Sequence, residues 1–223
     1  MLSILKQHLL ANPIGTSFPL PPFCLMVGGV SGVGKSALAG QLAQRLGAHL
    51  ETTDHLREAL RTAYPAEFYP ELHAHSYTAW RALPQNGLKT PKVFQGLQTQ
   101  ARLLEKGVQA VASRVAREGR SLVLEGVHLL PGHPIRAGYP LNLMVLLVVR
   151  SPQEHLRRLK QRAQTTRRDA GEALAHFSQV RALQEALERR ARLHRIPIIA
   201  ADEPGAEEAV LALLKHQSQG GRP

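Results

Sequence analysis

The chain has 223 residues, a formal net charge of +11, a single cysteine, and only five Phe, four Tyr and one Trp. This length allows one sizeable core, or a core with a small lid, and the single cysteine excludes a disulfide framework. The basic charge invites a nucleic-acid partner, but few aromatic side chains are available to stack on bases, so we expect none.

The first 22 residues predict an N-terminal extension, with a short helix and a proline-rich lead, FPLPPF, into the first strand. Their apolar stretch is too short and too interrupted to span a membrane, and it lacks a small-residue cleavage site. We therefore expect a cytoplasmic protein without a membrane partner. Residues 23–218 are predicted to form a single domain, and residues 219–223 a flexible tail.

The segment VGGVSGVGKSALAG, residues 27–40, contains a phosphate-loop motif. Gly29, Gly34, Lys35 and Ser36 match the spacing G-x-x-x-x-G-K-[ST]. An apolar run typical of a buried strand precedes the loop, and an amphipathic helical segment follows it. Lys35 would reach the β- and γ-phosphates of a nucleotide, and the Ser36 hydroxyl would bind Mg²⁺. The predicted nucleotide-binding set is Gly29, Val30, Ser31, Gly32, Val33, Gly34, Lys35, Ser36 and Ala37.

Residues 48–54, AHLETTD, predict a short second strand that ends in polar residues before a helix. Asp54 lies at this transition, beside the crevice that the phosphate loop faces. A carboxylate there can orient an acceptor hydroxyl and take its proton, although Asp is also a common helix cap. Arg57 and Arg61 share a helix face with Asp54, and they either hold an anionic acceptor or are solvated helix charges.

Residues 65–119 are predicted to be dominantly helical and to form the acceptor region. Within them, LHAHSYTAW offers either acceptor contacts or a packed helix. Two apolar strands follow, SLVLEG and LNLMVLLVV. Glu125 ends the first, where a carboxylate commonly holds Mg²⁺ directly or through water. His128 lies in the next loop, where it either touches the substrate or is structural.

A basic lid is predicted over about residues 157–170. This stretch contains Arg157, Arg158, Lys160, Arg162, Arg167 and Arg168. In small kinases such a lid closes over the transferring phosphates and neutralises developing charge. Arg158 and Arg162 share a helix face and are the predicted catalytic members of the lid. A merely solvated basic face is the alternative.

The remaining elements complete an alternating pattern of strands and helices. We predict one long helix over about residues 171–194, a fifth strand in IPIIAAD, and a final helix from Pro204. Strands separated by helices predict an α/β, P-loop NTPase fold with a five-stranded parallel sheet flanked by helices. Ligands in such folds bind at the carboxyl ends of the strands.

Taken together, the motifs resemble the 2-phosphoglycerate kinase family of P-loop kinases, which is related to zeta-toxin-like and nucleoside monophosphate kinases. The resemblance rests on GGVSGVGKS, TTDHLREALR, LHAHSYTAWRAL, LEGVHLLPG and HFSQVRALQEALERRARLHRIPII, and it covers roughly residues 24–202. It implies phosphorylation of a small anionic phosphorylated substrate by ATP with Mg²⁺. In this family the 3-hydroxyl of 2-phosphoglycerate is phosphorylated, giving 2,3-bisphosphoglycerate and ADP. The lid segment is only loosely matched, so the family does not assign its arginines individually.

Two other functions stay open at this point. One is a kinase for a different small acceptor, such as a nucleotide, a sugar or a sugar nucleotide. The other is a nucleic-acid-binding ATPase, for which the only support is the basic charge. The oligomeric state, monomer or homodimer, also stays open.

Overall fold

Five parallel strands form one sheet in the computed structural model, which describes residues 20–84, 92–165 and 170–220. The strands are β1 (Phe23–Gly28), β2 (His49–Thr52), β3 (Leu122–Gly126), β4 (Leu141–Val148) and β5 (Ile198–Ala200). Their order across the sheet is β2-β3-β1-β4-β5. The predicted five-stranded parallel sheet is confirmed.

The centre of the sheet consists of β1, β3 and β4, whose residues are almost all apolar and buried. In register, Met26 of β1 pairs with Leu124 of β3 and with Met144 of β4. Because both faces of these strands are covered, their sequences show no alternation of apolar and polar residues. The edge strands β2 and β5 have only four and three residues, which leaves little unpaired backbone exposed.

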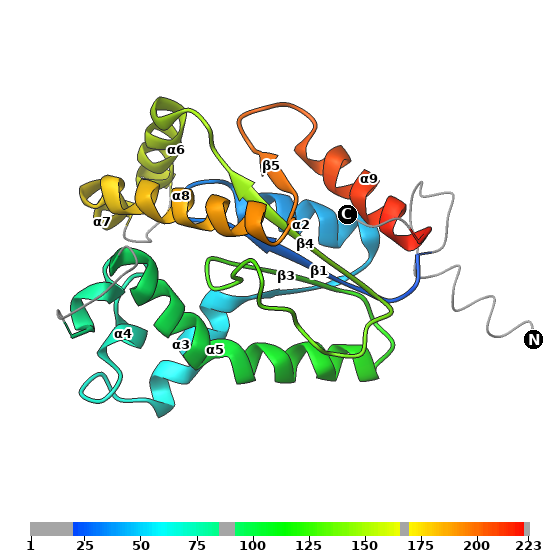
Figure 1. The fold of residues 1–223 in the computed structure, drawn as a ribbon, viewed down its shortest axis with the longest axis horizontal. Coiled ribbons are helices and arrows are strands. Elements are labelled where there is room, and N and C mark those ends of the chain that lie inside the picture. The colour runs from blue at the N-terminus through cyan, green and yellow to red at the C-terminus, as the bar shows by residue number, and fades with distance from the viewer. Residues whose placement is uncertain (1–19, 85–91, 166–169, 221–223) are drawn as a thin grey trace, which may run out of the picture.

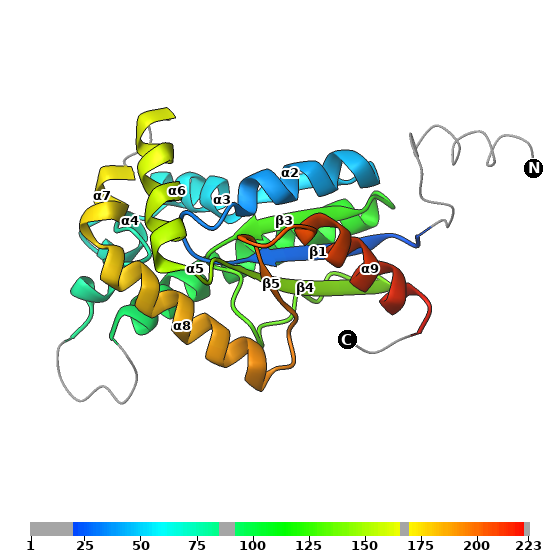
Figure 2. The same ribbon diagram turned by 90° about the horizontal axis from the view of Figure 1, so that it is seen from above.

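Helices cover both faces of the sheet (Figure 1). Among them are α2 (Lys35–Leu46), α5 (Lys92–Arg117), α8 (Phe177–Leu193) and α9 (Ala206–Ser218). In the view of Figure 2, α2 lies above the sheet and α8 below it. Helix α9 packs beside α2, and α5 packs beside α8. The strands are thus packed between two layers of helices. The loops that carry polar residues follow the carboxyl ends of these strands.

Strand β2 ends earlier than the sequence pattern predicts, and α3 (Thr53–Ala63) begins immediately after it. The side chain of Thr52 accepts a hydrogen bond from the backbone N–H of Asp54 at 3.0 Å. Thr52 is therefore the helix cap, and the interpretation of Asp54 as the cap is wrong. The Asp54 side chain is exposed on the first turn of α3.

Residues 65–119 are mainly helical, as predicted, through the long helix α5, but the part before residue 85 contains less helix than predicted. The short helices α4 (Pro70–His73) and η1 (Ala79–Ala82) are joined by turns, and residues 85–91 lie outside the described part. Prolines in this stretch disfavour a continuous helix because each lacks a backbone donor and restricts the preceding residue. The η1 segment packs directly on α5, since a side chain at Gly96 would overlap the backbone of Ala79 and Trp80.

The predicted helix over residues 171–194 is divided into α7 (Ala170–Ala175) and α8. The break is at His176, whose backbone angles are φ −112° and ψ 29°. This turn allows α7 to pack against α6 (Pro152–Thr165). The predicted N-terminal helix and the lid residues Arg167 and Arg168 lie outside the described ranges. Across those ranges, no helix is both long enough and apolar enough to cross a membrane.

Candidate functional site

The phosphate-loop motif forms a tight loop between β1 and α2. Gly29, Gly32 and Gly34 adopt φ angles of 147°, 85° and 95°, which residues with a side chain rarely adopt. A Cβ atom at Gly29 would lie 2.5 Å from the carbonyl oxygen of Leu147, so the loop lies close to β4. The loop leads into the N-terminus of α2, where backbone N–H groups lack partners within the helix. This geometry suits an anion such as phosphate.

The two predicted metal ligands lie in direct contact beside this loop. The Ser36 hydroxyl donates to Glu125 Oε1 at 2.9 Å. Glu125 is buried at the end of β3. Lys35, the neighbour of Ser36, donates from Nζ to the Val30 carbonyl oxygen at 2.9 Å, so its ammonium group lies over the loop.

The Ser36–Glu125 pair fits Mg²⁺, which prefers oxygen ligands and usually takes only one or two from protein. Within residues 20–84, 92–165 and 170–220, no group of three or more His, Cys, Asp or Glu side chains could hold a metal ion. A metal ion at Ser36 and Glu125 would therefore take its other ligands from phosphate oxygens and water.

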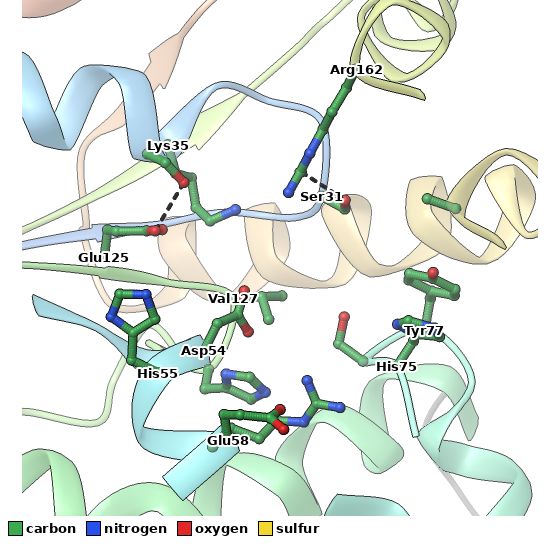
Figure 3. Close-up of a pocket in the computed structure, with 15 residues that line it drawn as sticks. Ser31, Lys35, Asp54, His55, Glu58, His75, Tyr77, Glu125, Val127 and Arg162 are labelled. Atoms are coloured by element: carbon green, nitrogen blue, oxygen red, sulfur yellow. Dashed lines mark hydrogen bonds between the residues drawn. The ribbon is translucent and has the colours of Figure 1, made fainter. Parts of the chain in front are cut away.

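A cavity of about 340 Å³ opens between the loop and α3, at the carboxyl ends of β2 and β3. In Figure 3, Lys35 and Arg162 lie on one side of it, and Asp54 and Glu58 lie on the opposite side. The polar residues at neighbouring strand ends thus share one crevice. We call this space the α3 cavity.

Of the two arginines predicted on α3, only Arg57 lines the α3 cavity. Its Nε and Nη2 atoms donate to the carbonyl oxygens of Leu72 and Ala74, each at 2.8 Å. These bonds hold the guanidinium group against α4, and burial lowers its pKa. Arg61 instead donates to Glu58 at 2.8 Å and to His73 Nδ1 at 3.3 Å, and it does not line the cavity. The structure therefore does not bring Arg61 to the site.

His128 is buried and lines the α3 cavity. Its Nδ1 atom lies 2.9 Å from Thr53 Oγ1, at the start of α3. Its Nε2 atom is buried and has no hydrogen-bond partner among the described residues. Burial lowers the pKa of His128 to about 4, so the imidazole is neutral at pH 7. Nδ1 thus has a structural role, and Nε2 is a buried nitrogen without a partner among the described residues.

Arg158, the first predicted lid arginine, is held by three acceptors. Its Nε donates to Glu154 at 2.8 Å, and its Nη1 and Nη2 donate to the carbonyl oxygens of Val33 and Ala201 at 3.3 and 2.7 Å. Hydrogen bonds from Arg157 and Arg158 lower the pKa of Glu154 to about 2. The bond to Val33 ties α6 to the phosphate loop, and the bond to Ala201 ties it to the end of β5.

Arg162, the second predicted lid arginine, faces the site. Its Nη1 atom lies 3.5 Å from Ser31 Oγ. It lines the α3 cavity and also a second space of about 560 Å³, which runs along the loop between α2 and α6. Lys35 and Ser36 line both spaces as well. The two cavities therefore meet at Lys35, Ser36 and Arg162.

Aromatic rings form the wall of the α3 cavity between the acceptor region and α7. The ring of Tyr77 stacks on His75 at 5.1 Å and on His176 at 5.7 Å between centroids. Arg81 Nη2 lies 3.0 Å from His176 Nε2. The predicted acceptor segment thus reaches the cavity through His75 and Tyr77, and Tyr77 is also buried, as the packing alternative requires.

Sequence analysis missed His155, which is fully buried beneath the phosphate loop. Its Nε2 atom lies 2.8 Å from the carbonyl oxygen of Ser31. The signal that could have identified it is helical spacing, because His155, Leu159 and Arg162 follow one another on a single face of α6.

The chain is similar in sequence to archaeal 2-phosphoglycerate kinases. It is 35% identical over 179 residues to the 2-phosphoglycerate kinase of Pyrococcus furiosus, in a match that covers 80% of this chain and 59% of that protein. It is 33% identical over 187 residues to the enzyme of the same name from Methanothermobacter thermautotrophicus, covering 80% of this chain and 60% of that one. The chain thus spans about three fifths of the length of these curated relatives. No family model matches it.

Among solved structures, a gluconokinase from Sinorhizobium meliloti 1021 aligns with a TM-score of 0.51 and 16% sequence identity, covering 92% of this chain and 100% of that one. At this identity the likeness shows the fold alone. The predicted P-loop kinase fold and the predicted resemblance to the 2-phosphoglycerate kinase family are both confirmed.

Proposed function

We propose that this relative of the 2-phosphoglycerate kinases transfers a phosphoryl group from ATP to a hydroxyl group of a small anionic acceptor. One observation carries the proposal: the α3 cavity and the cavity along the loop share Lys35, Ser36 and Arg162. A transfer between two ligands requires two binding spaces that meet at the group being moved. Two of the shared residues are cations, which suits a transferring phosphoryl group.

On the nucleotide side, the backbone N–H groups of Gly29 to Ser36 would surround the phosphates of ATP. Lys35 would bind the β- and γ-phosphates, and Ser36 and Glu125 would hold Mg²⁺. The metal ion supplies charge neutralisation between those phosphates. Arg162 would contribute positive charge from the lid side.

On the acceptor side, Asp54 would orient the hydroxyl group and take its proton as the hydroxyl oxygen attacks the γ-phosphorus. The bond between that phosphorus and the bridging oxygen breaks, and ADP leaves. His128 lines the same cavity and would contribute to its acceptor side. Arg158 donates to Glu154 and to two backbone carbonyls and also lines the cavity along the loop, so it would support the loop and add positive charge on the nucleotide side.

Within this class we propose 2-phosphoglycerate as the acceptor and its 3-hydroxyl as the nucleophile. A phosphomonoester carries about −1.5 to −2 charge at neutral pH, and the carboxylate adds another negative charge. Lys35, Arg57 and Arg162 line the α3 cavity and complement that charge. The relation to 2-phosphoglycerate kinases supports the same acceptor.

The direct test is transfer from MgATP to 2-phosphoglycerate, with 3-phosphoglycerate, nucleoside monophosphates and simple sugars assayed in parallel. We expect selective formation of 2,3-bisphosphoglycerate and ADP. Rapid transfer to one of the other acceptors would keep the kinase and overturn the acceptor. Hydrolysis of ATP that is stimulated by DNA or RNA, without transfer to any acceptor, would overturn both.

A further inference from the structure

The outer side of the phosphate loop depends on α6 for its hydrogen bonds. A loop that turns its N–H groups inward around a phosphate directs its carbonyl oxygens outward, and buried carbonyls need donors. The carbonyl oxygen of Ser31 has His155 Nε2 at 2.8 Å, and that of Val33 has Arg158 Nη1 at 3.3 Å. Both donors belong to α6, so this helix supports the loop from behind.

The surroundings of His155 determine which ring nitrogen carries the proton. A carbonyl oxygen only accepts, so Nε2 must be the donor to Ser31. The other nitrogen, Nδ1, lies 3.5 Å from Nη1 of Arg181, which can only donate. The ring edge also packs against Phe177 at 5.5 Å between centroids. The imidazole is thus held as a neutral Nε2–H donor.

The charges near His155 favour this neutral form. Burial is the largest influence that lowers its pKa, and Arg181, Arg158 and Lys35 lower it further, against the hydrogen bond to Ser31. The neutral donor therefore holds the Ser31 carbonyl without adding another positive charge to those of Arg181, Arg158 and Lys35.

The loop rests directly on this part of α6. A Cβ atom at Gly32 would lie 2.6 Å from Leu159 Cδ2 and 3.1 Å from His155 Cδ2. The side chains of Leu159 and His155 thus pack directly against the loop backbone at Gly32, so the position of His155 is transmitted to that backbone. Ser31, which receives the hydrogen bond, is within the loop and lines the α3 cavity.

We propose that His155 is a positioning residue that holds the phosphate loop in its nucleotide-binding shape before the nucleotide arrives. The inference rests on the proposed nucleotide binding at this loop. Without the Nε2–H donor, the loop would populate other conformations, and the apparent dissociation constant for nucleotide rises as the binding-competent fraction falls. Acceptor affinity should change less than nucleotide affinity, because most residues that line the α3 cavity lie outside the loop.

A matched pair of variants separates the hydrogen bond from the packing. His155→Gln and His155→Met have side chains of similar length, but only glutamine can donate to the Ser31 carbonyl. We expect MgADP to bind His155→Met about tenfold more weakly than the wild type, because ordering even one loop residue is costly, and His155→Gln to recover most of the loss. Calorimetric titration with MgADP measures both, and the KM values for ATP and acceptor show whether the effect is confined to nucleotide.

Leu214→Ala is the control for a general loss of stability. Leu214 is fully buried on α9, away from the loop, so its truncation should lower the melting temperature and leave MgADP binding unchanged. Should His155→Met fail to fold, His155→Phe, which keeps a ring beside Phe177 and also lacks the donor, takes its place.

The outcomes are distinct. Two results would overturn the role of His155. One is wild-type affinity for MgADP in a folded variant that lacks the donor, and the other is an equal loss of MgADP affinity in the glutamine and methionine variants. Absence of MgADP binding by the wild-type protein would overturn the proposed nucleotide site itself, and this inference with it.

Discussion

Replacing Lys35 with alanine should lower phosphoryl transfer by about 100- to 1000-fold while leaving the fold intact. Lys35 is the first residue of α2, and its ammonium group lies over the phosphate loop through a 2.9 Å hydrogen bond to the Val30 carbonyl oxygen. It also lines both cavities, at the point where they meet. Its charge is therefore at the site of transfer, whereas its contribution to packing is small.

The structure allows the expected loss of stability to be compared with the expected loss of turnover. A hydrogen bond from a charged donor contributes about 1.5–3 kcal/mol, and removing a cation from a helix N-terminus returns about 0.3–1 kcal/mol. The net loss of about 1–2 kcal/mol lowers the melting temperature of a chain of this size by roughly 2–8 °C. Removing one preorganised donor to the transferring group should instead lower turnover by about 100- to 1000-fold.

The assay follows ADP release in the presence of MgATP and 2-phosphoglycerate, together with a thermal melt of each protein. Lys215→Ala is the matched control, because Lys215 is an exposed lysine on α9. It should retain wild-type turnover. A folded Lys35→Ala protein with turnover within about tenfold of the wild type would refute the assignment of Lys35.

Three further predictions test other parts of the site. Glu125→Gln retains an acceptor for Ser36 but loses the negative charge, so the Mg²⁺ concentration for half-maximal rate should rise by at least about tenfold; an unchanged Mg²⁺ dependence would contradict the metal assignment. Burial lowers the pKa of His128 from 6.5 to about 4, so the unfolded chain binds the proton more tightly than the folded protein does. The neutral imidazole should therefore contribute stability that is fully present above pH 6.5 and is lost as the pH falls toward 4. This amounts to on the order of 3 kcal/mol, so the free energy of unfolding should fall less steeply with acid in His128→Gln than in the wild type, and equal slopes would refute it. Tyr77→Ala removes the ring between His75 and His176, and it should raise the KM for the acceptor by about tenfold with little change in the KM for ATP; equal increases in both would show that the wall is not specific to the acceptor.

The parts of the protein that local sequence determines were predictable. The glycines, Lys35 and Ser36 occupy a loop whose backbone angles only glycine adopts readily, so the motif and its strand and helix follow from the residues themselves. The apolar runs of β1, β3 and β4 are buried on both faces, which identifies them as central parallel strands. The contact between Ser36 and Glu125 was also foreseeable, because parallel strands present their carboxyl ends at one edge of the sheet.

The roles of individual basic residues could not be predicted in the same way. Arg57 and Arg61 share a helix face in sequence, yet only Arg57 lines the α3 cavity, because Arg61 pairs with Glu58 and His73 on the outer side. Similarly, Arg158 is held by backbone carbonyls and lines only the cavity along the loop, whereas Arg162 lines both cavities. Helical spacing specifies which side chains lie on one face, but the partners that each one meets come from segments distant in sequence.

The sequence by itself thus determined the phosphate loop, the sheet, and the carboxylates at its edge, since these depend on backbone conformation and on burial patterns that are local. Only the tertiary structure decided that His155 supports the loop, that the chain breaks at His176, and that two cavities meet at Lys35, Ser36 and Arg162. The physical reason is that a buried histidine or arginine takes its role from the particular carbonyl or carboxylate it pairs with, and such partners meet only when distant helices pack.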